Sequence, residues 1–145
     1  MTTSGERNFF PSSERLSLQK DIDRLFDTGQ AFISYPLRII YLPDSGDPAT
    51  HSAISILVSV SKKRIKLAVD RNRIKRLIRE SFRLNKNETS TLFKLNGKHL
   101  HIAYIYICND VKTFTVIEKA VLKAFDIIRR KAYGAAQDIQ PAKVN

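Results

Sequence analysis

A chain of 145 residues can bury one sizeable core, and its composition, 43% hydrophobic and 27% charged, is ordinary for a single globular domain. The net charge of +11 predicts a polyanionic partner, with nucleic acid favoured over an anionic membrane surface. No apolar run reaches the roughly 18 residues of a membrane span or the form of a signal peptide, and the single Cys108 permits no internal disulfide, which suits a reducing cytoplasm.

The first part of the chain predicts an arm and a short helix. Residues 1–13 are mostly polar and are expected to form a flexible arm. A helix is predicted over 17–28, begun by an N-cap at Ser17 and ended at Gly29. Four apolar residues share one face of that helix: Leu18, Ile22, Leu25 and Phe26. From the pattern alone, core packing is the simpler explanation of Ile22 and Phe26.

Two strands are predicted next, over 37–42 and 54–61. The first is rich in β-branched and aromatic residues. In the second, apolar residues alternate with mostly small polar ones, which predicts one buried face. A turn-rich connection over 43–50 joins the strands, so we expect them to pair antiparallel.

A strongly basic segment follows, because residues 62–83 contain ten basic and two acidic residues and therefore carry a net charge of +8. A helix is predicted over 67–84. At about 100° per residue, its apolar residues fall in one arc and its polar ones in the opposite arc. The apolar arc contains Ile74, Leu77, Ile78, Phe82 and Leu84. The polar arc contains Asn72, Lys75, Arg76, Arg79 and Arg83, with Arg71 and Arg73 near its borders.

The last third of the chain predicts a strand and a helix. Residues 85–98 read as a polar connection that ends in a turn at Asn96-Gly97. The strand over 100–107 is apolar on both faces, so it belongs inside the sheet. The final helix is expected over 113–133, with an N-cap at Thr113 and an end at Gly134. Residues 134–145 are expected to form a disordered tail.

These elements predict an α+β fold with the order α-β-β-α-β-α, in which helices pack on a mixed sheet of three to four strands. Residues 14–133 form a single RNA-binding domain in this interpretation. The strand before the basic helix and the strand after it should be parallel and close together in the sheet.

Few residues are arranged for catalysis. The fourteen acidic residues show no cluster typical of a metal-dependent nuclease. His99 and His101 lie on one face of a strand, so a metal could bridge them, but two histidines without a third ligand are more simply explained as exposed polar residues.

The basic helix instead suits recognition of a phosphate backbone, because several cations on one ridge give strong, salt-dependent binding. Asn72 adds a hydrogen-bond acceptor among donors. The alternative is a solvated helix face. Such a face normally balances its cations with carboxylates one turn away, and here that balance is nearly absent.

Two stretches, Ser59-Val-Ser-Lys-Lys and Ala68-Val-Asp-Arg-Asn-Arg-Ile-Lys-Arg-Leu-Ile-Arg-Glu, closely resemble the signature of the bacterial ribonuclease P protein subunit. The similarity extends over about residues 14–131. The resemblance implies a ribosomal-protein-like fold with a left-handed βαβ crossover. It also implies a role in tRNA processing, in which a catalytic RNA subunit uses Mg²⁺ to cut the 5′ leader from precursor tRNA, and the protein itself has no catalytic residue and binds no cofactor.

The resemblance assigns two groups of binding residues. The RNA-binding group is Arg71, Asn72, Arg73, Arg76 and Arg79. The polar arc adds Lys75 and Arg83 to the RNA-binding residues, and Lys62 and Lys63 are expected to bind RNA at the edge of the leader cleft. The leader-cleft group is Phe26, Tyr41 and Ile22. The family commonly has an aromatic residue where this chain has Ile22, and residues 64–67 are one residue longer than usual and lack the usual glycine.

Three hypotheses follow. The first is a subunit of the ribonuclease P ribonucleoprotein, with the catalytic RNA and precursor tRNA as partners. The second is a ribosomal or ribosome-assembly protein that binds rRNA. The third is a free-standing nuclease that depends on His99 or His101. The sequence leaves open whether the holoenzyme forms a dimer.

Overall fold

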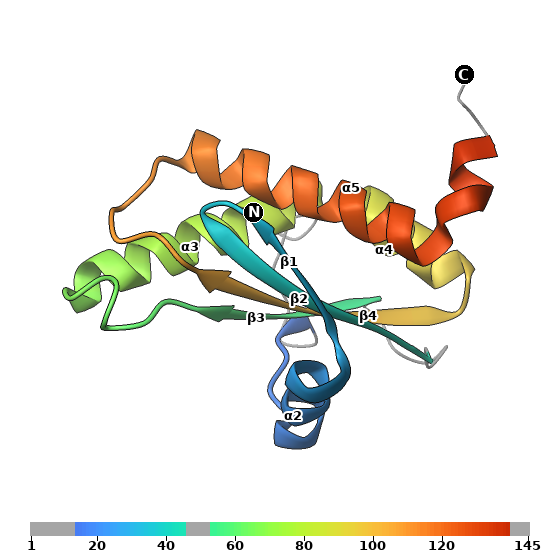
Figure 1. Ribbon diagram of the computed structural model, residues 1–145, viewed down its shortest axis with the longest axis horizontal. Coiled ribbons are helices and arrows are strands. Elements are labelled where there is room, and N and C mark those ends of the chain that lie inside the picture. The colour runs from blue at the N-terminus through green and yellow to red at the C-terminus, as the bar shows by residue number, and fades with distance from the viewer. Residues whose placement is uncertain (1–13, 46–52, 140–145) are drawn as a thin grey trace, which may run out of the picture.

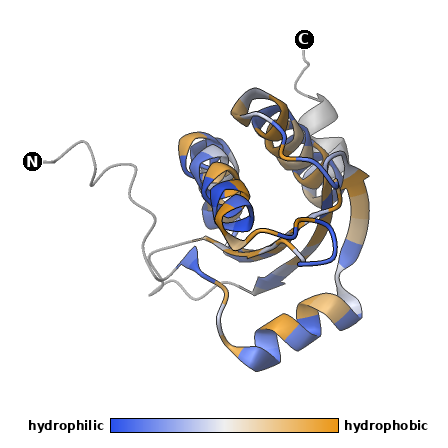
Figure 2. Ribbon diagram, turned by 90° about the vertical axis from the view of Figure 1, so that its left-hand side faces the viewer, coloured by the Kyte–Doolittle hydropathy of each residue, from blue (hydrophilic) through white to orange (hydrophobic). Residues whose placement is uncertain are grey.

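The fold has three layers, with one sheet between two unequal helical layers. The computed structural model describes residues 14–45 and 53–139. Helices α3, α4 and α5 cover one face of the sheet and α2 lies against the other (Figure 1, Figure 2). The elements are α2 (Gln19–Thr28), β1 (Gln30–Ser34), β2 (Leu37–Ser45), β3 (Ile54–Ser59), α3 (Ala68–Asn85), α4 (Asn87–Leu95), β4 (Lys98–Tyr106) and α5 (Phe114–Ile139).

The four strands have the order β1-β2-β4-β3. The β2 strand pairs antiparallel with β1 and with β4, and β3 pairs parallel with β4. The strands predicted over 37–42 and 54–61 are β2 and β3. Their predicted antiparallel pairing is wrong, because β4 lies between them. The prediction of parallel neighbours on either side of the basic helix is confirmed. The handedness of that crossover and the ribosomal-protein-like architecture stay predictions.

The central place of β4 follows from its residues. Leu100, Ile102 and Tyr104 are buried on the side of α3 and α5, and Ala103 is buried on the side of α2. A strand that is apolar on both faces is most stable with a neighbour on each side. The α2 side of β3 carries the polar Ser55, which is compatible with a place at the edge.

Two clusters of buried side chains hold the layers together. The larger joins the sheet to α3, α4 and α5 and includes Ile78, Phe82 and Phe125. The smaller joins α2 to the sheet and consists of Leu16, Leu25, Ile40 and Ala103. Among the described residues the smaller cluster has four buried members, so they hold α2 by far less apolar contact than the helices on the other face.

Helix α2 begins later than expected and ends where expected. Its N-cap is Leu18, without a side-chain hydrogen bond, so the predicted cap at Ser17 is wrong. Gly29 is the C-cap, with an extended backbone (φ −71°). A glycine is needed there for space, because a Cβ atom would lie 2.4 Å from the carbonyl oxygen of Leu25.

Helix α3 matches its predicted range closely, whereas α5 extends beyond its own. In α3 the buried residues are Ile74, Ile78, Ser81 and Phe82, whereas Leu84 is 45% exposed and does not belong to the buried arc. Helix α5 is kinked at Gly134 and continues to Ile139, beyond its predicted end. The predicted arm over 1–13 and residues 140–145 of the predicted tail lie outside the described residues.

Strand β1 and helix α4 were not predicted from the sequence. The β1 strand has only five residues and polar ends, so its alternation is too short to stand out. Helix α4 contains weak helix formers, and it is fixed by the burial of Thr89 and Phe93, one turn apart. No helix in the described part of the chain is long and apolar enough to cross a membrane.

Candidate RNA-binding surface

The outward face of α3 is held rigidly by the packing of its inward face. Ile74, Ile78 and Phe82 are fully buried, and the Phe82 ring lies 6.1 Å from that of Phe125 on α5 (centroid to centroid). The helix therefore cannot rotate without opening the main core. Its polar arc faces away from the sheet: Asn72, Arg73 and Arg76 are exposed, and Lys75, Arg79 and Arg83 are half-buried.

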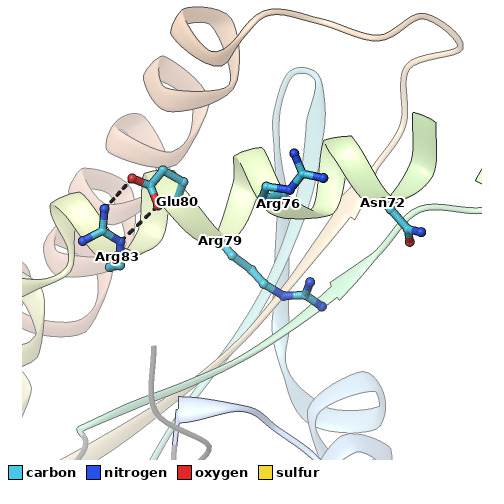
Figure 3. A pocket seen from close by; sticks show the side chains of 5 residues that line it. All are labelled: Asn72, Arg76, Arg79, Glu80 and Arg83. Atoms are coloured by element: carbon cyan, nitrogen blue, oxygen red, sulfur yellow. Dashed lines mark hydrogen bonds and ion pairs between the residues drawn. The ribbon is translucent and has the colours of Figure 1, made fainter. Parts of the chain in front are cut away.

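A shallow depression of about 330 Å³ lies on this face, lined by Asn72, Arg76, Arg79, Glu80 and Arg83 (Figure 3). Among the described residues, Glu80 supplies the only carboxylate of the lining. The Nε of Arg83 donates to Oε1 of Glu80 at 3.0 Å. This hydrogen bonding lowers the pKa of Glu80 and raises that of Arg83. Since Arg83 is neutralised by Glu80, Arg76 and Arg79 are the guanidinium groups of the depression that can meet phosphate.

Arg79 differs from Arg83 in the direction of its pKa shift. Its pKa is lowered, first by partial burial and then by the nearby positive charge of Arg15. An anion near Arg79 would offset the positive charge of Arg15, which makes this end of the depression favourable for a phosphate group. Arg15, in the segment before α2, was not identified from the sequence.

Arg71 has a different role from the rest of its triplet. Its Nη1 donates to the carbonyl oxygens of Ile65, at 3.0 Å, and Lys66, at 2.8 Å. These hydrogen bonds close the loop between β3 and α3. The exposed Lys62 and Lys63 lie in the same loop, so Arg71 fixes the connection that presents them.

The α2 side of the sheet presents a second candidate surface. Leu25 is fully buried against the sheet, whereas its neighbour Phe26 is 45% exposed. Ile22 is half-buried and packs on the smaller cluster. Core packing therefore accounts for Ile22 and does not account for Phe26, whose ring is available to a ligand.

Tyr41 does not lie on this surface, so its assignment to the leader cleft is wrong. Its side chain is buried in the main core, and its hydroxyl group donates to Oε1 of Gln30 at 2.9 Å. Residues 39 and 41 share one face of β2, and alternation puts the exposed Arg38 on the opposite face with Ile40. Strand residues alternate between the two faces of a sheet, and this alternation could have identified Arg38 as an exposed residue of β2 on the α2 side.

His99 and His101 pack against each other with ring centroids 4.8 Å apart. His101 is only 7% exposed, so the prediction of two exposed histidines is wrong. Nε2 of His99 shares a hydrogen bond with Oγ of Ser55 at 2.9 Å. Across the described ranges, no three histidine, cysteine, aspartate or glutamate residues are grouped in a way that could hold a metal ion.

Comparison with known proteins decides between the hypotheses. The model of the ribonuclease P family matches residues 10–128. The ribonuclease P protein component of Porphyromonas gingivalis is 41% identical over 112 residues, which cover 77% of this chain and 80% of that protein. The chain belongs to the ribonuclease P family. The protein component of Chlorobium phaeobacteroides is 36% identical over 106 residues, 69% of this chain and 73% of that protein.

Solved structures of ribonuclease P proteins share the fold. The Staphylococcus aureus protein superposes with a TM-score of 0.59 at 22% identity, covering 80% of this chain and 95% of that one. The Thermotoga maritima protein gives a TM-score of 0.59 at 21% identity, covering 79% and 96%. The α+β architecture is thus confirmed, and the ribosomal-protein hypothesis is not favoured by these matches.

Proposed function

We propose that the protein is the protein subunit of ribonuclease P and assists the endonucleolytic removal of the 5′ leader from precursor tRNA in the cytoplasm. The outward face of α3 binds the catalytic RNA, and the α2 side of the sheet binds the leader. The main support is the rigid mounting of α3, whose inward residues are fully buried while a ridge of cations faces outward.

In this proposal the chemistry belongs to the RNA subunit, which uses Mg²⁺. The protein contributes charge and position. Arg76 and Arg79 neutralise phosphates, and Asn72 offers both a donor and an acceptor to a hydroxyl group or base edge. The exposed ring of Phe26 offers a stacking surface to an unpaired base of the leader, with Arg38 on the same side of the sheet.

The direct test is reconstitution. The protein is mixed with a bacterial ribonuclease P RNA and precursor tRNA at an Mg²⁺ concentration too low for the RNA alone. We expect restored cleavage at the 5′ end of the mature tRNA, and no stimulation would contradict the proposal. A matched variant, Arg76→Glu with Arg79→Glu, should lose the stimulation, whereas Lys94→Glu with Lys98→Glu should retain it.

A competition assay separates this function from rRNA binding. Labelled catalytic RNA bound to the protein is challenged with unlabelled rRNA fragments or unlabelled catalytic RNA. We expect the catalytic RNA to compete at much lower concentration. Equal or better competition by rRNA would favour a ribosomal role.

A further inference from the structure

A second depression lies between the edge strand β1 and helix α5. Its volume is about 480 Å³, and it is lined by Phe32, Ile33, Lys123, Ile127, Arg130 and Lys131. The β1 and β3 strands are at opposite edges of the sheet. Helix α5 packs over β1 and β2, whereas α3 packs over β3. A ligand on the outward face of α3 therefore leaves this depression, the β1–α5 groove, open.

The floor of the β1–α5 groove is apolar. Phe32 and Ile127 form it, and both are half-buried. Ile33 also borders the groove, but it pairs with Arg38, so its exposed side chain lies on the α2 side of the edge strand. The ring of Phe32 is fixed edge-on against Tyr41, with centroids 5.9 Å apart. An aromatic ring and an isoleucine side by side on the surface leave apolar area that a ligand can remove from water.

The rim of the groove is cationic. Arg130 pairs with Asp126. Lys123 and Lys131 form no ion pair with any residue that the structure describes, and no carboxylate belongs to the lining. The groove thus combines an apolar floor with two uncompensated ammonium groups, which favours a ligand with both an anionic and a flat apolar part.

We propose that the β1–α5 groove is a third RNA-binding site, which takes one or two unpaired nucleotides. A base lies on Phe32 and Ile127, and the adjoining phosphates meet Lys123 and Lys131. Unpaired nucleotides fit this combination, because every base has an apolar face and every linkage a negative charge. The inference rests on the proposed function only in taking RNA as the polyanion.

The site can be tested without the catalytic RNA. A fluorescent six-nucleotide uridine RNA is titrated with the Arg76→Ala, Arg79→Ala variant, which weakens the α3 face, and binding is followed by anisotropy. Adding Lys123→Glu and Lys131→Glu should weaken binding at least about fivefold and reduce the slope of log K against log salt by about 1.4. The control Lys94→Glu, Lys98→Glu makes the same charge change outside the groove and should have a much smaller effect.

The apolar floor needs its own measurement. An oligonucleotide of the same length without bases should bind the protein more weakly than the uridine RNA. The difference between the two affinities should be smaller in the Ile127→Ser variant. Circular dichroism and thermal unfolding show whether that variant is folded, and methyl NMR shifts of Ile127 on addition of the uridine RNA give an independent readout in the unaltered chain.

Three outcomes would overturn the inference: equal weakening by the groove and control variants, unchanged methyl shifts, or competition by polyglutamate as effective as that by RNA, which would point to an acidic protein partner. Failure of the reconstitution assay with groove binding intact would instead overturn the proposed function alone.

Discussion

The Nζ atom of Lys86 lies 2.7 Å from both carboxylate oxygens of Glu14. Both side chains are largely buried, and the same ammonium group lies 5.7 Å from the centre of the Phe82 ring. Lys86 separates α3 from α4, and Glu14 precedes α2. The ion pair therefore connects the beginning of the described chain to the end of the RNA-binding helix.

Replacing Lys86 by methionine should destabilise the fold by about 3 kcal/mol, because it leaves a buried carboxylate without its partner. Urea unfolding followed by circular dichroism measures the change. The double variant Glu14→Gln, Lys86→Met removes the unpaired charge and should recover part of the loss. If the single variant unfolds at the same urea concentration as the parent, the pair contributes nothing to stability.

Neighbouring residues of α2 should separate stability from leader binding. Leu25→Ala should cost about 2–4 kcal/mol, because a fully buried leucine is removed. Phe26→Ala should change stability by less than about 1 kcal/mol, because its ring is already half in water, yet it should weaken binding of a precursor tRNA with a leader. A leaderless tRNA is the control, and equal weakening for both RNAs would contradict a leader contact.

The features that could be predicted from the sequence are those set by the local spacing of apolar residues. The inward residues of α3 and α5 follow from their spacing, and so does the interior place of β4. The pairing of β2 with β4 could not be predicted, because it depends on contacts between residues more than fifty positions apart, such as Leu37 and Tyr106. The burial of Tyr41 could have been predicted, since it alternates in phase with the apolar Leu37 and Ile39.

Charge on α3 should appear in the salt dependence of RNA binding. Arg76→Ala and Arg79→Ala should each lower the slope of log K against log salt by about one, because each removes one phosphate contact. Filter binding to the catalytic RNA at several salt concentrations measures the slope. Lys94→Ala removes a charge from α4 and should leave it nearly unchanged. An unchanged slope in both arginine variants would mean that this face does not meet phosphate.

Glu80→Gln should tighten binding of the catalytic RNA about twofold to fivefold, because it releases Arg83 from its ion pair and removes a negative charge from the depression. Glu88→Gln makes the same change on the exposed surface of α4 and serves as the control. Weaker binding of the Glu80 variant would show that the pair is needed to orient Arg83.

The pH dependence of stability should report on His101. Burial lowers its pKa, and the nearby carboxylates of Asp21 and Asp44 oppose only part of the effect. Below about pH 6.5 His101 of the unfolded chain takes up a proton that the folded chain does not. The contribution of His101 to stability is therefore fully present above that pH and is lost as the pH falls below it.

Urea unfolding between about pH 7.5 and pH 5.5 measures this dependence. The variant His101→Gln should show a smaller change over the same range. An equally steep loss in the variant would assign the effect to other groups.

The place of β4 between β2 and β3 has a consequence for the order of folding. Both neighbours precede it in the chain, and they do not pair with each other. A nascent chain that ends before residue 98 holds the β1–β2 hairpin, an unpaired β3 and the entire basic helix. The helix therefore emerges from the ribosome, itself a particle rich in RNA, before the sheet that supports it can close. The sheet is complete only after β4, in the last third of the protein, has been synthesised. Before that, the cations of α3 are exposed on a partly folded chain.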